Sequence, residues 1–502
     1  MPSTDQLPDR IADMFHGRTV FITGGSGFLG KILVEKLLRR CVGVKTIYLL
    51  IRDKKGKSPH ERMSDIFDNM LFDLLKEQQP NAIKKCKPIC GDVTQNDLGI
   101  SPEDRKILQN EVDFIYHSAA STRFDSTVKV AAKMNTRGTK YMLDLAHECK
   151  KLKVFVHVST AYAYPHEKIL YEKTYPPPAD PSEVLATIDF DREDDSDEPF
   201  HLGLLGDCPN TYTFTKALAE GLVVEEMNRL PAIIVRPSIV CPTWREPLSG
   251  WCNNLQGPMG LFVGAGKGII RSMYMQGDSY ADFIPADIVI NGMILSTWYL
   301  LNCDKNQRIF NITASSEYNL SWEELIEAGK DVIRNHIPFN GVVWYPDGSI
   351  KKSKLIHNIC FYLFQIIPAI FIDALLMVLG YKPISLYQIQ RRIQKGGEMF
   401  EYYTTKAWNF DNKELRKITK SLNEKEKKIY KLDGEGLEIK DYLKGCIMGV
   451  RRNNLKETDD MLPAARRNMK IMWVLDVFCK SMFVMAILYY TYRWILQPLF
   501  KI

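Results

Sequence analysis

The eight residues Thr23-Gly24-Gly25-Ser26-Gly27-Phe28-Leu29-Gly30 decide the fold of this chain. They follow a short β-branched run, Thr19–Thr23, and open an amphipathic stretch. At such a strand-to-helix turn, Gly24 allows the tight bend, Gly27 lets the backbone approach a pyrophosphate, and Gly30 brings the helix close to the sheet. The anion then lies on the N–H groups of the helix N-terminus. The pattern predicts a dinucleotide-binding turn that contacts its cofactor through Gly24, Ser26, Gly27, Phe28, Leu29 and Gly30.

Short strand-like runs continue to alternate with longer amphipathic stretches as far as about Pro237. The predicted strands are Thr19–Thr23, Thr46–Ile51, Cys86–Gly91, Val112–His117, Val154–Val158 and Ile233–Val235. Helix-period apolar residues lie between them, in Gly30–Arg40 and Val128–His147. Such alternation favours an α/β fold with a doubly wound parallel sheet of the Rossmann type, covered by helices on both faces.

The composition excludes several classes of protein. The chain has 502 residues, 45% of them hydrophobic and 11% aromatic, which supplies a large core and excludes a mainly disordered protein. With 66 Lys+Arg against 60 Asp+Glu and no long basic tract, we expect no nucleic-acid partner, whereas a membrane surface or a polyanionic ligand stays open. The polar N-terminus and 11 scattered cysteines indicate a cytosol-facing protein with free thiols, and the nine histidines show no metal-ligand spacing.

Cofactor selectivity is expected at the ends of the second and third strands. About twenty residues after the glycine turn, NAD enzymes place a carboxylate that holds the ribose 2′-OH. Here the second strand is followed by Arg52, which fits the 2′-phosphate of NADPH, although adjacent Asp53 is an alternative partner for it. After the third strand, Asp92 and Val93 are predicted to lie beside the adenine, with a turn-forming role for Asp92 as the alternative.

The candidate catalytic residues come from two separate stretches. Ser159-Thr160 ends the fifth predicted strand, and Tyr212 precedes Lys216 by one helical turn, so the two side chains share a helix face. A lysine and an oxidised nicotinamide both lower the pKa of a tyrosine, which can then exchange protons near neutrality. We therefore predict Thr160, Tyr212 and Lys216 as the catalytic residues, with Ser159 as an alternative donor, and expect Tyr212 and Lys216 also to contact the cofactor. Two further Tyr-x-x-x-Lys sequences, expected to lie out of reach, begin at Tyr164 and Tyr402.

Two other segments attract attention. Pro176–Pro181 and the acidic run Asp189–Glu198 predict a surface loop, either a solvated excursion or a lid over the site. Gly264–Gly268 imitates a phosphate-binding loop but lacks the required spacing and a preceding strand, so we interpret it as a turn.

The C-terminal third contains two apolar segments. Ile359–Gly380 is long enough to span a bilayer, but its polar residues leave buried, interfacial and spanning helices open. Ile471–Phe500 follows several basic residues, and we expect it to anchor the chain in a membrane, with a terminal helical hairpin as the alternative. The predicted division is 1–350 for the NADP-binding domain with substrate-side elements, 351–470 for a helical C-terminal reductase region, and 471–502 for the anchor.

Several further stretches carry a family resemblance. They are Leu50–Arg52 with Lys55–Ser58 and Arg62, His117–Ala120, Val158–Ala163, Tyr175–Pro178, Pro209–Glu220, Arg236–Val240, Gly250-Trp251 with Asn254 and Gly257-Pro258, Pro368-Ala369 with Asp373, Trp408–Asn412 and Gly449–Arg451. Together with the glycine turn, they make the chain similar to the alcohol-forming fatty acyl-CoA reductases of the insect type, within the extended short-chain dehydrogenase/reductase class.

The resemblance implies reduction of a long-chain acyl-CoA to a primary alcohol by NADPH in two hydride steps, with release of CoA. It also implies that Ala119 contacts the cofactor, that membrane lipid is a partner, and that the catalytic domain faces the cytosol at the endoplasmic reticulum or the peroxisome. The alternatives are a steroid or sugar-nucleotide dehydrogenase on the same scaffold, or a non-catalytic NADP-binding membrane protein.

Overall fold

The chain forms two compact units, each assembled from separate stretches of sequence. The computed structural model describes residues 6–54, 56–190, 203–255, 258–280, 282–314, 317, 320–381 and 385–496. Unit 1 consists of Met1–Asn253, Tyr280–Asn319 and Trp408–Leu437, and unit 2 consists of Asn254–Ser279, Leu320–Ala407 and Glu438–Ile502. Both units are therefore discontinuous, and the linear division into 1–350, 351–470 and 471–502 stays a prediction about the roles of these stretches.

Unit 1 is built on a seven-stranded parallel sheet with the order β10-β6-β5-β4-β1-β2-β3. Its strands are β1 Thr19–Thr23, β2 Thr46–Ile51, β3 Cys86–Cys90, β4 Phe114–His117, β5 Val154–Val158, β6 Ala232–Pro237 and β10 Ile309–Ile312. The order reverses between β1 and β4, and ligands of open α/β sheets bind at the carboxyl ends of strands beside such a reversal. The predicted doubly wound class is confirmed, and β10 is the one strand of this sheet that was not predicted.

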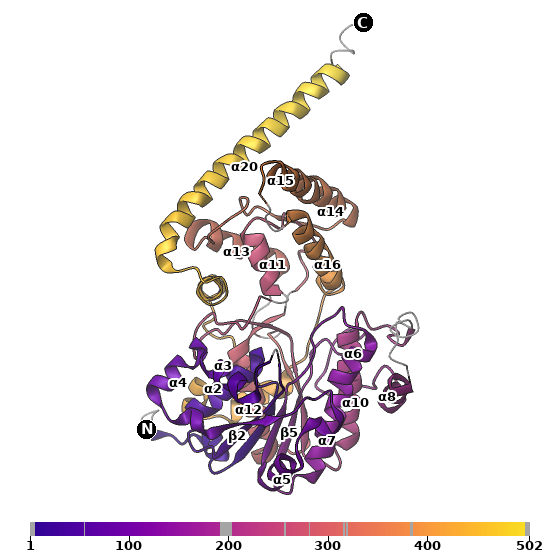
Figure 1. Cartoon of the computed structure of the whole chain (residues 1–502), viewed down its shortest axis with the longest axis vertical. Helices are drawn as coiled ribbons and strands as arrows, with labels where there is room; N and C mark the ends of the chain where they lie inside the picture. The colour runs from indigo at the N-terminus through magenta and orange to yellow at the C-terminus, as the bar shows by residue number, and fades with distance from the viewer. Residues whose placement is uncertain are drawn as a thin grey trace. The chain divides into compact units, whose positions relative to one another are not determined.

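Helices cover both faces of this sheet (Figure 1). Apolar residues of α2 (Phe28–Arg40), α12 (Ala286–Asn302) and α17 (Lys413–Ser421) join one core cluster with Val20 and Ile22 of β1. Phe21, which lies between these two residues, points to the opposite face of the sheet. There it joins a second core cluster with apolar residues of α5 (Pro102–Glu111), α7 (Gly138–Glu148) and α10 (Thr211–Glu226). The other helices of unit 1 include α1 Arg10–Met14, α3 Pro59–Phe67, α4 Asp73–Gln78, α6 Val128–Ala132, α8 Pro181–Phe190 and α18 Glu424–Ile429.

The proline-rich segment is only partly a loop. Residues 176–180 are irregular, but α8 begins at Pro181, where the missing N–H costs nothing. The Asp180 side chain caps this helix by accepting hydrogen bonds from the backbone N–H groups of Ser182 and Glu183, at 2.8 and 3.0 Å. The loop prediction is therefore wrong for Pro181–Phe190, and the rest of the acidic run lies outside the described residues.

Unit 2 is mainly helical. Its elements include β8 Ser272–Tyr274 paired with β11 Ser349–Lys351, and the helices α11 Pro258–Gly266, α13 Trp322–Asp331, α14 Lys354–Phe361, α15 Ile367–Val378, α16 Leu386–Thr404, α19 Ile439–Gly449 and α20 Leu462–Thr491. The predicted turn at Gly264–Gly268 is the C-terminal end of α11 and the residues directly after it, with Gly268 at φ +74°.

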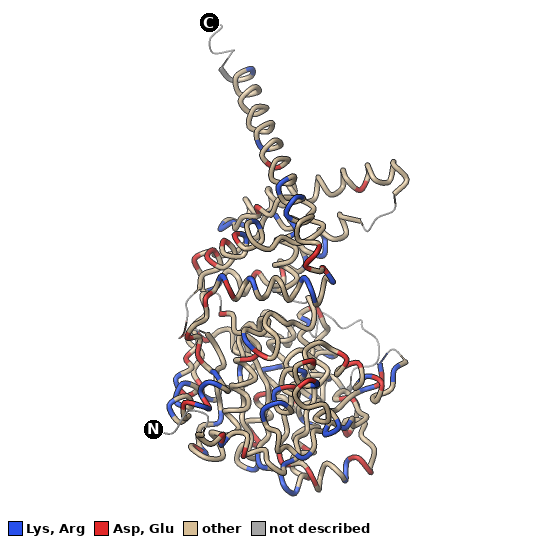
Figure 2. The backbone as a smooth tube through the Cα atoms, turned by 90° about the vertical axis from the view of Figure 1, so that its left-hand side faces the viewer, with Lys and Arg blue, Asp and Glu red and all other residues tan. Residues whose placement is uncertain are grey.

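Two helical segments of unit 2 have the length and composition to cross a membrane. They are Lys354–Val378, which contains an 18-residue stretch of mean hydropathy 2.1, and Asp459–Trp494, which contains one of mean hydropathy 2.0. Along α20, charged residues thin out toward the C-terminal end (Figure 2), and none stands between Lys480 and Arg493. The two segments suggest that the protein associates with a membrane.

Candidate active site

The glycine turn leaves no room for a side chain at Gly24 or Gly30. Gly24 has φ +73°, and a Cβ there would lie 2.8 Å from the backbone nitrogen of Ala119. A Cβ on Gly30 would lie 2.2 Å from the Gly24 carbonyl oxygen, and one on Gly27 would lie 3.0 Å from the same atom. Helix α2 begins at Phe28 with no side chain capping its first N–H groups. These donors face the end of β1, so the turn fits the pyrophosphate of a dinucleotide.

A buried hydrogen-bond chain holds the neighbouring strand end in place. Thr139 donates its hydroxyl proton to the Asn135 carbonyl, and its oxygen lies 3.1 Å from His117 Nε2. His117 Nε2 therefore carries the ring proton, and Nδ1 accepts a 2.7 Å hydrogen bond from the Thr23 hydroxyl. Burial lowers the pKa of His117 to about 3, so the ring is neutral. This chain fixes β4 beside β1 and places the predicted contact residue Ala119 against the glycine turn.

Two guanidinium groups meet at the end of β2. Arg52 is half-exposed and forms a 3.1 Å ion pair with Asp92, which among the described residues takes the place of the alternative partner Asp53. Arg62, on α3, donates a hydrogen bond to the Arg52 carbonyl. Burial and the nearby Arg52 charge both lower the pKa of Arg62. Two guanidinium groups therefore lie at the end of β2, with the Asp92 carboxylate beside Arg52.

Asp92 also forms a turn of its own. Its carboxylate accepts hydrogen bonds from the N–H and the hydroxyl of Thr94, at 3.0 and 2.9 Å. Burial works against ionisation, but the Thr94 donors and Arg52 prevail and lower the pKa of Asp92. Val93 is buried and packs against Gly138, so its predicted contact with adenine stays a prediction.

Helix α10 presents the predicted Tyr–Lys pair. It begins after Asn210, whose side chain accepts a 2.9 Å hydrogen bond from the Thr213 N–H. Tyr212 is partly exposed and stacks on Phe124, with ring centroids 5.7 Å apart. Lys216 is buried one turn later, and its ammonium donates a 2.6 Å hydrogen bond to the Val158 carbonyl. The lysine is thus bound to the strand that leads into Ser159-Thr160, and the catalytic role of these residues stays a prediction.

Both candidate hydroxyls at the end of β5 are buried. Thr160 Oγ1 accepts a 3.2 Å hydrogen bond from the Tyr162 N–H, which leaves its own proton for another acceptor. Ser159 Oγ has no hydrogen-bond partner within the described part of the chain. The geometry therefore keeps both Thr160 and Ser159 as candidate donors to a substrate carbonyl.

The surroundings of Lys216 control its charge. Burial lowers its pKa to about 8, and the Glu220 carboxylate, one turn further along α10, opposes that shift. The lysine nitrogen also lies 3.3 Å from Nε2 of His157, whose pKa burial and the Lys216 charge keep well below its ordinary value. Glu220 in turn forms a fully buried 2.7 Å ion pair with Arg236. The lysine is therefore held between a neutral imidazole, a carbonyl and a compensated carboxylate.

The other two Tyr-x-x-x-Lys sequences have different surroundings. Tyr164 is buried against the Arg236 guanidinium, which lies 5.3 Å from its ring centroid, and burial raises its pKa. Tyr402 lies on α16 in unit 2, with the Lys406 nitrogen 3.7 Å above its ring.

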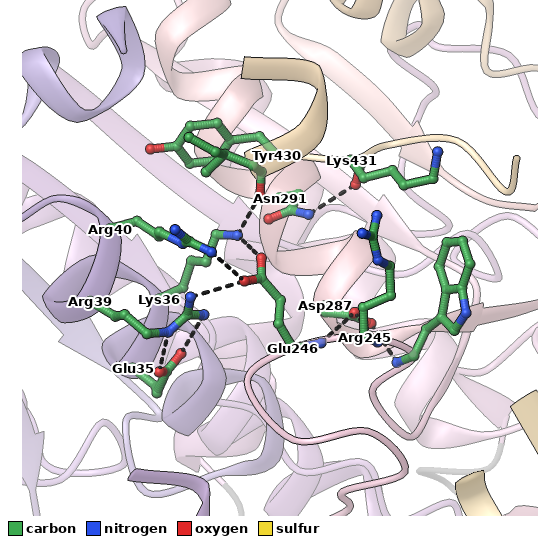
Figure 3. A network of polar contacts seen from close by, with 12 residues as sticks. Glu35, Lys36, Arg39, Arg40, Arg245, Glu246, Asp287, Asn291, Tyr430 and Lys431 are labelled. Carbon is green, nitrogen blue, oxygen red and sulfur yellow. Dashed lines mark hydrogen bonds and ion pairs between the residues drawn. The ribbon is translucent and has the colours of Figure 1, made fainter. Parts of the chain in front are cut away.

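A network of buried charges holds the body of α2 (Figure 3). Lys36 pairs with Glu246 and donates to the Ile429 carbonyl at 2.7 Å, and Arg39 reaches the other Glu246 oxygen at 2.9 Å. Asp287, on α12, fixes the Glu246 loop by accepting hydrogen bonds from three consecutive backbone N–H groups. Burial opposes ionisation of Glu246, but Lys36 and Arg39 lower its pKa to about 2. The helix that carries the glycine turn is thereby tied to α12 and to the 408–437 segment.

Arg62 and His157 were not predicted to take part in the site. Arg62 stands ten residues after Arg52 and acts through tertiary placement, so spacing along the strand carries no signal for it. His157 is a buried residue of β5, three residues before Thr160. From the sequence, the run Val154–Val158 predicts a buried strand and gives no sign that His157 contacts Lys216. Within the described ranges, no three His, Cys, Asp or Glu side chains are grouped to hold a metal ion.

The sheet order, the glycine turn and the Tyr–Lys pair on α10 define an oxidoreductase of the extended short-chain dehydrogenase/reductase class with a nicotinamide cofactor. Residues 22–293 match a family model described as "Male sterility protein", and residues 364–457 match a second model with the same description. The chain belongs to the fatty acyl-CoA reductase family.

Individual relatives agree with this membership. Fatty acyl-CoA reductase 1 of Xenopus laevis is 35% identical over 460 residues, covering 91% of this chain and 89% of the relative. A putative fatty acyl-CoA reductase of Drosophila melanogaster is 37% identical over 475 residues, covering 93% and 92%. The crystal structure of the terminal R domain from the myxalamid PKS-NRPS pathway has a TM-score of 0.58 at 17% identity, covering 87% of this chain and 91% of that one. At that identity the likeness to the R domain concerns the fold alone.

Proposed function

We propose that this protein reduces long-chain fatty acyl-CoA to the primary alcohol, using two molecules of NADPH and releasing coenzyme A. The observation that carries the proposal is the placement of Lys216, which binds the β5 backbone at Val158 and so joins the Tyr212 helix to the Ser159-Thr160 strand end. In a chain 35% identical to a named fatty acyl-CoA reductase over 91% of its length, this arrangement supports carbonyl reduction.

The preference for NADPH rests on the cationic end of β2. When bound, the nicotinamide supplies the hydride for each step. Arg52 exposes about two-fifths of its side chain and already binds one anion, the Asp92 carboxylate. A 2′-phosphate would compete with Asp92 for this guanidinium, and charge-assisted contacts of this kind are the stronger hydrogen bonds in proteins. Arg62 adds a second positive charge beside it.

The proton donor in the proposal is Tyr212. Its ring stacks on Phe124 and the residue is partly exposed, which fits a group that meets a substrate carbonyl. Lys216, one turn away, stabilises the phenolate when it carries its proton, which lowers the pKa of the tyrosine. Thr160, or Ser159 as the alternative, donates a hydrogen bond to the oxygen on which negative charge develops.

These groups would act twice. In the first reduction the thioester carbonyl gains a hydride and the hydroxyl donors stabilise the negative oxygen. The C–S bond then breaks to re-form a carbonyl, and the departing thiolate takes up a proton to become free coenzyme A. In the second, the aldehyde gains a hydride and Tyr212 gives its proton to the alkoxide, which leaves as the alcohol. The balance is two NADPH and two protons consumed for each acyl-CoA.

We also propose that α20 attaches the protein to a membrane and that the reductase unit lies on the cytosolic side, where NADPH and acyl-CoA are found. The length and hydropathy of this helix support attachment, and the basic residues Arg466, Arg467 and Lys470 precede its apolar part as the positive-inside rule expects. An endoplasmic reticulum or peroxisomal membrane stays our prediction for the compartment.

The test is an incubation of the detergent-purified full chain with palmitoyl-CoA and NADPH, followed by lipid analysis. We expect hexadecanol and free coenzyme A, with two NADPH oxidised for each alcohol. Parallel incubations with a steroid and a sugar nucleotide cover the rival dehydrogenases. Turnover of either, with palmitoyl-CoA inert, would overturn the assignment, and binding of NADPH without any turnover would favour the non-catalytic protein.

A further inference from the structure

The first apolar segment of unit 2 has one buried face and one exposed face, and both are largely apolar. It runs from α14 through a π-helical turn, Tyr362–Ile366, into α15. Phe361, Gln365 and Ala369, spaced four apart, are at most 4% exposed, so this row packs on unit 2. The opposite side is apolar and open to solvent at Leu355, Ile356, Ile359, Leu363, Ile367, Ile370, Phe371, Met377 and Val378.

The polar residues that interrupt this segment are bound within unit 2. Gln365 accepts a 2.8 Å hydrogen bond from the backbone N–H of Arg271. Asp373 accepts from the Ser385 hydroxyl and from the N–H groups of Leu386 and Tyr387, at 2.7, 2.9 and 2.9 Å, and so holds the start of α16. To cross the bilayer, this segment would have to leave unit 2 and break these contacts. The freed polar groups would then lie in hydrocarbon, where no water can replace the lost hydrogen bonds.

The first half of α20 is bound to the same unit. Asp476 is 2% exposed and accepts a 2.6 Å hydrogen bond from the Trp344 indole N–H. It also pairs with the Arg271 guanidinium at 3.3 Å and with Lys480 at 2.7 Å, and Lys480 pairs with Asp347. The first ten residues of the predicted anchor Ile471–Phe500 are therefore held against the rest of unit 2 by Asp476 and Lys480. Only the part beyond Lys480 can enter a bilayer without breaking these contacts.

Arg271 connects the two apolar segments. Its backbone N–H binds Gln365 on the first segment, and its guanidinium binds Asp476 on the second. Just beyond this link, the rings of Phe364 and Phe483 meet edge to face with centroids 6.4 Å apart. The exposed apolar face of the first segment is thus continuous with α20 beyond Lys480.

We propose that a lipid bilayer covers this continuous surface, with Lys354–Val378 lying in the plane of one leaflet and α20 entering the bilayer beyond Lys480. An in-plane helix buries its apolar face at the boundary between headgroups and acyl chains, which suits a segment whose other face is fixed to protein. Lys480, with Asp347 beside it, marks the level of the headgroups, because long basic side chains extend toward the interface. The inference rests on the proposed membrane attachment and names the face that makes it.

The test uses the full chain reconstituted in phosphatidylcholine vesicles, with the photo-reactive residue p-benzoyl-phenylalanine introduced at one phenylalanine at a time. Phe371 is 67% exposed on α15, Phe483 is 55% exposed on α20, and Phe361 is 4% exposed on the buried row of α14. Phe361 is the matched control because it lies in the same segment and has the same side chain. We expect lipid adducts at Phe371 and Phe483, several times more abundant than at Phe361.

Three results would overturn the in-plane helix. Equal lipid adducts at Phe371 and Phe361 would indicate that the segment is detached from unit 2. Lipid adducts at Phe483 alone, or crosslinks from Phe371 to a second copy of the chain, would also refute it. If the wild-type chain does not sediment with the vesicles at all, the membrane attachment itself is wrong, which separates the two failures. Activity toward palmitoyl-CoA is measured on the same samples and is a separate question.

Discussion

The substitution Gly30→Ala tests the glycine turn most sharply. The new Cβ would lie 2.2 Å from the Gly24 carbonyl oxygen and 2.7 Å from the Gly25 Cα, and both neighbours are main-chain atoms that cannot rotate away. Ordinary contacts begin at 3.4 Å, so the start of α2 must separate from the turn by about 1 Å. Hydrogen bonds span only about 2.7 to 3.2 Å, and a shift of this size moves backbone donors out of reach of the pyrophosphate.

The magnitude follows from those lost contacts. A hydrogen bond to a charged group contributes about 1.5 to 3 kcal/mol, so losing one weakens NADPH binding about tenfold to a hundredfold. Overpacking also costs about 1 to 3 kcal/mol of stability. Gly27→Ala should cost less, because its single close neighbour is 3.0 Å away.

The assay is a fluorescence titration of the purified variants with NADPH. The control is Gly329→Ala in α13, where a Cβ meets nothing within 4 Å and NADPH affinity should stay at the wild-type value. Wild-type affinity in a folded Gly30→Ala protein would show that the glycine turn does not hold the cofactor.

Further outcomes are expected for the cofactor and for Lys216. Arg52→Ala should narrow the ratio of kcat/KM for NADPH over NADH by about tenfold or more, since it removes a charge-assisted contact to the 2′-phosphate, and an unmoved ratio would refute that role. Because burial lowers the pKa of Lys216 to about 8, the ammonium is lost as pH rises through that value, and kcat/KM should fall above about pH 8. Glu220→Gln removes the carboxylate that opposes this shift, so the alkaline limb should move to lower pH, and a fixed limb would count against Lys216. The same variant leaves the buried Arg236 charge without its carboxylate partner, with only the Tyr171 and Lys173 carbonyls as further acceptors among the described residues, a loss of about 3 to 5 kcal/mol. Its lower Tm should largely recover in the double variant Glu220→Leu/Arg236→Met.

Most of the fold could be predicted from the alternation of strand-like runs with helix-period apolar stretches. The bounds of β1, β2 and β5 match the predicted runs, because fully buried parallel strands read as continuous β-branched and apolar residues. Strand β10 escaped notice because Asn311 interrupts its four residues, and only the structure shows that this side chain is buried, bonded to the carbonyls of Leu170 and Asp411.

Local composition led to a wrong prediction for one other segment. Prolines and acidic residues predicted a loop through Pro181–Phe190, but Leu185 and Ile188 pack into the core and Asp180 caps the helix. The polar residues Gln365 and Asp476 made membrane spans less certain in the sequence, and this question stays open. The structure adds that both side chains bind Arg271, which lies far away along the chain.

The candidate site was predictable where one motif holds its residues together. Tyr212 and Lys216 lie on one helix, so their common face follows from spacing alone. The partners of Lys216 come from β5, and the Arg236 that compensates Glu220 comes from β6, so their contributions depend on strand order and not on sequence distance.

The most direct test of the central claim follows the hydrides. The full chain is incubated with palmitoyl-CoA and NADPH that carries deuterium at both C4 positions, and the hexadecanol is examined by mass spectrometry. We predict two deuterium atoms on C1 of each alcohol. Tyr212→Phe should lose about 10² to 10⁴ in rate while still binding NADPH, with Tyr402→Phe close to wild type. Alcohol with one deuterium or none, or a Tyr212→Phe protein that forms hexadecanol at the wild-type rate, would contradict the account.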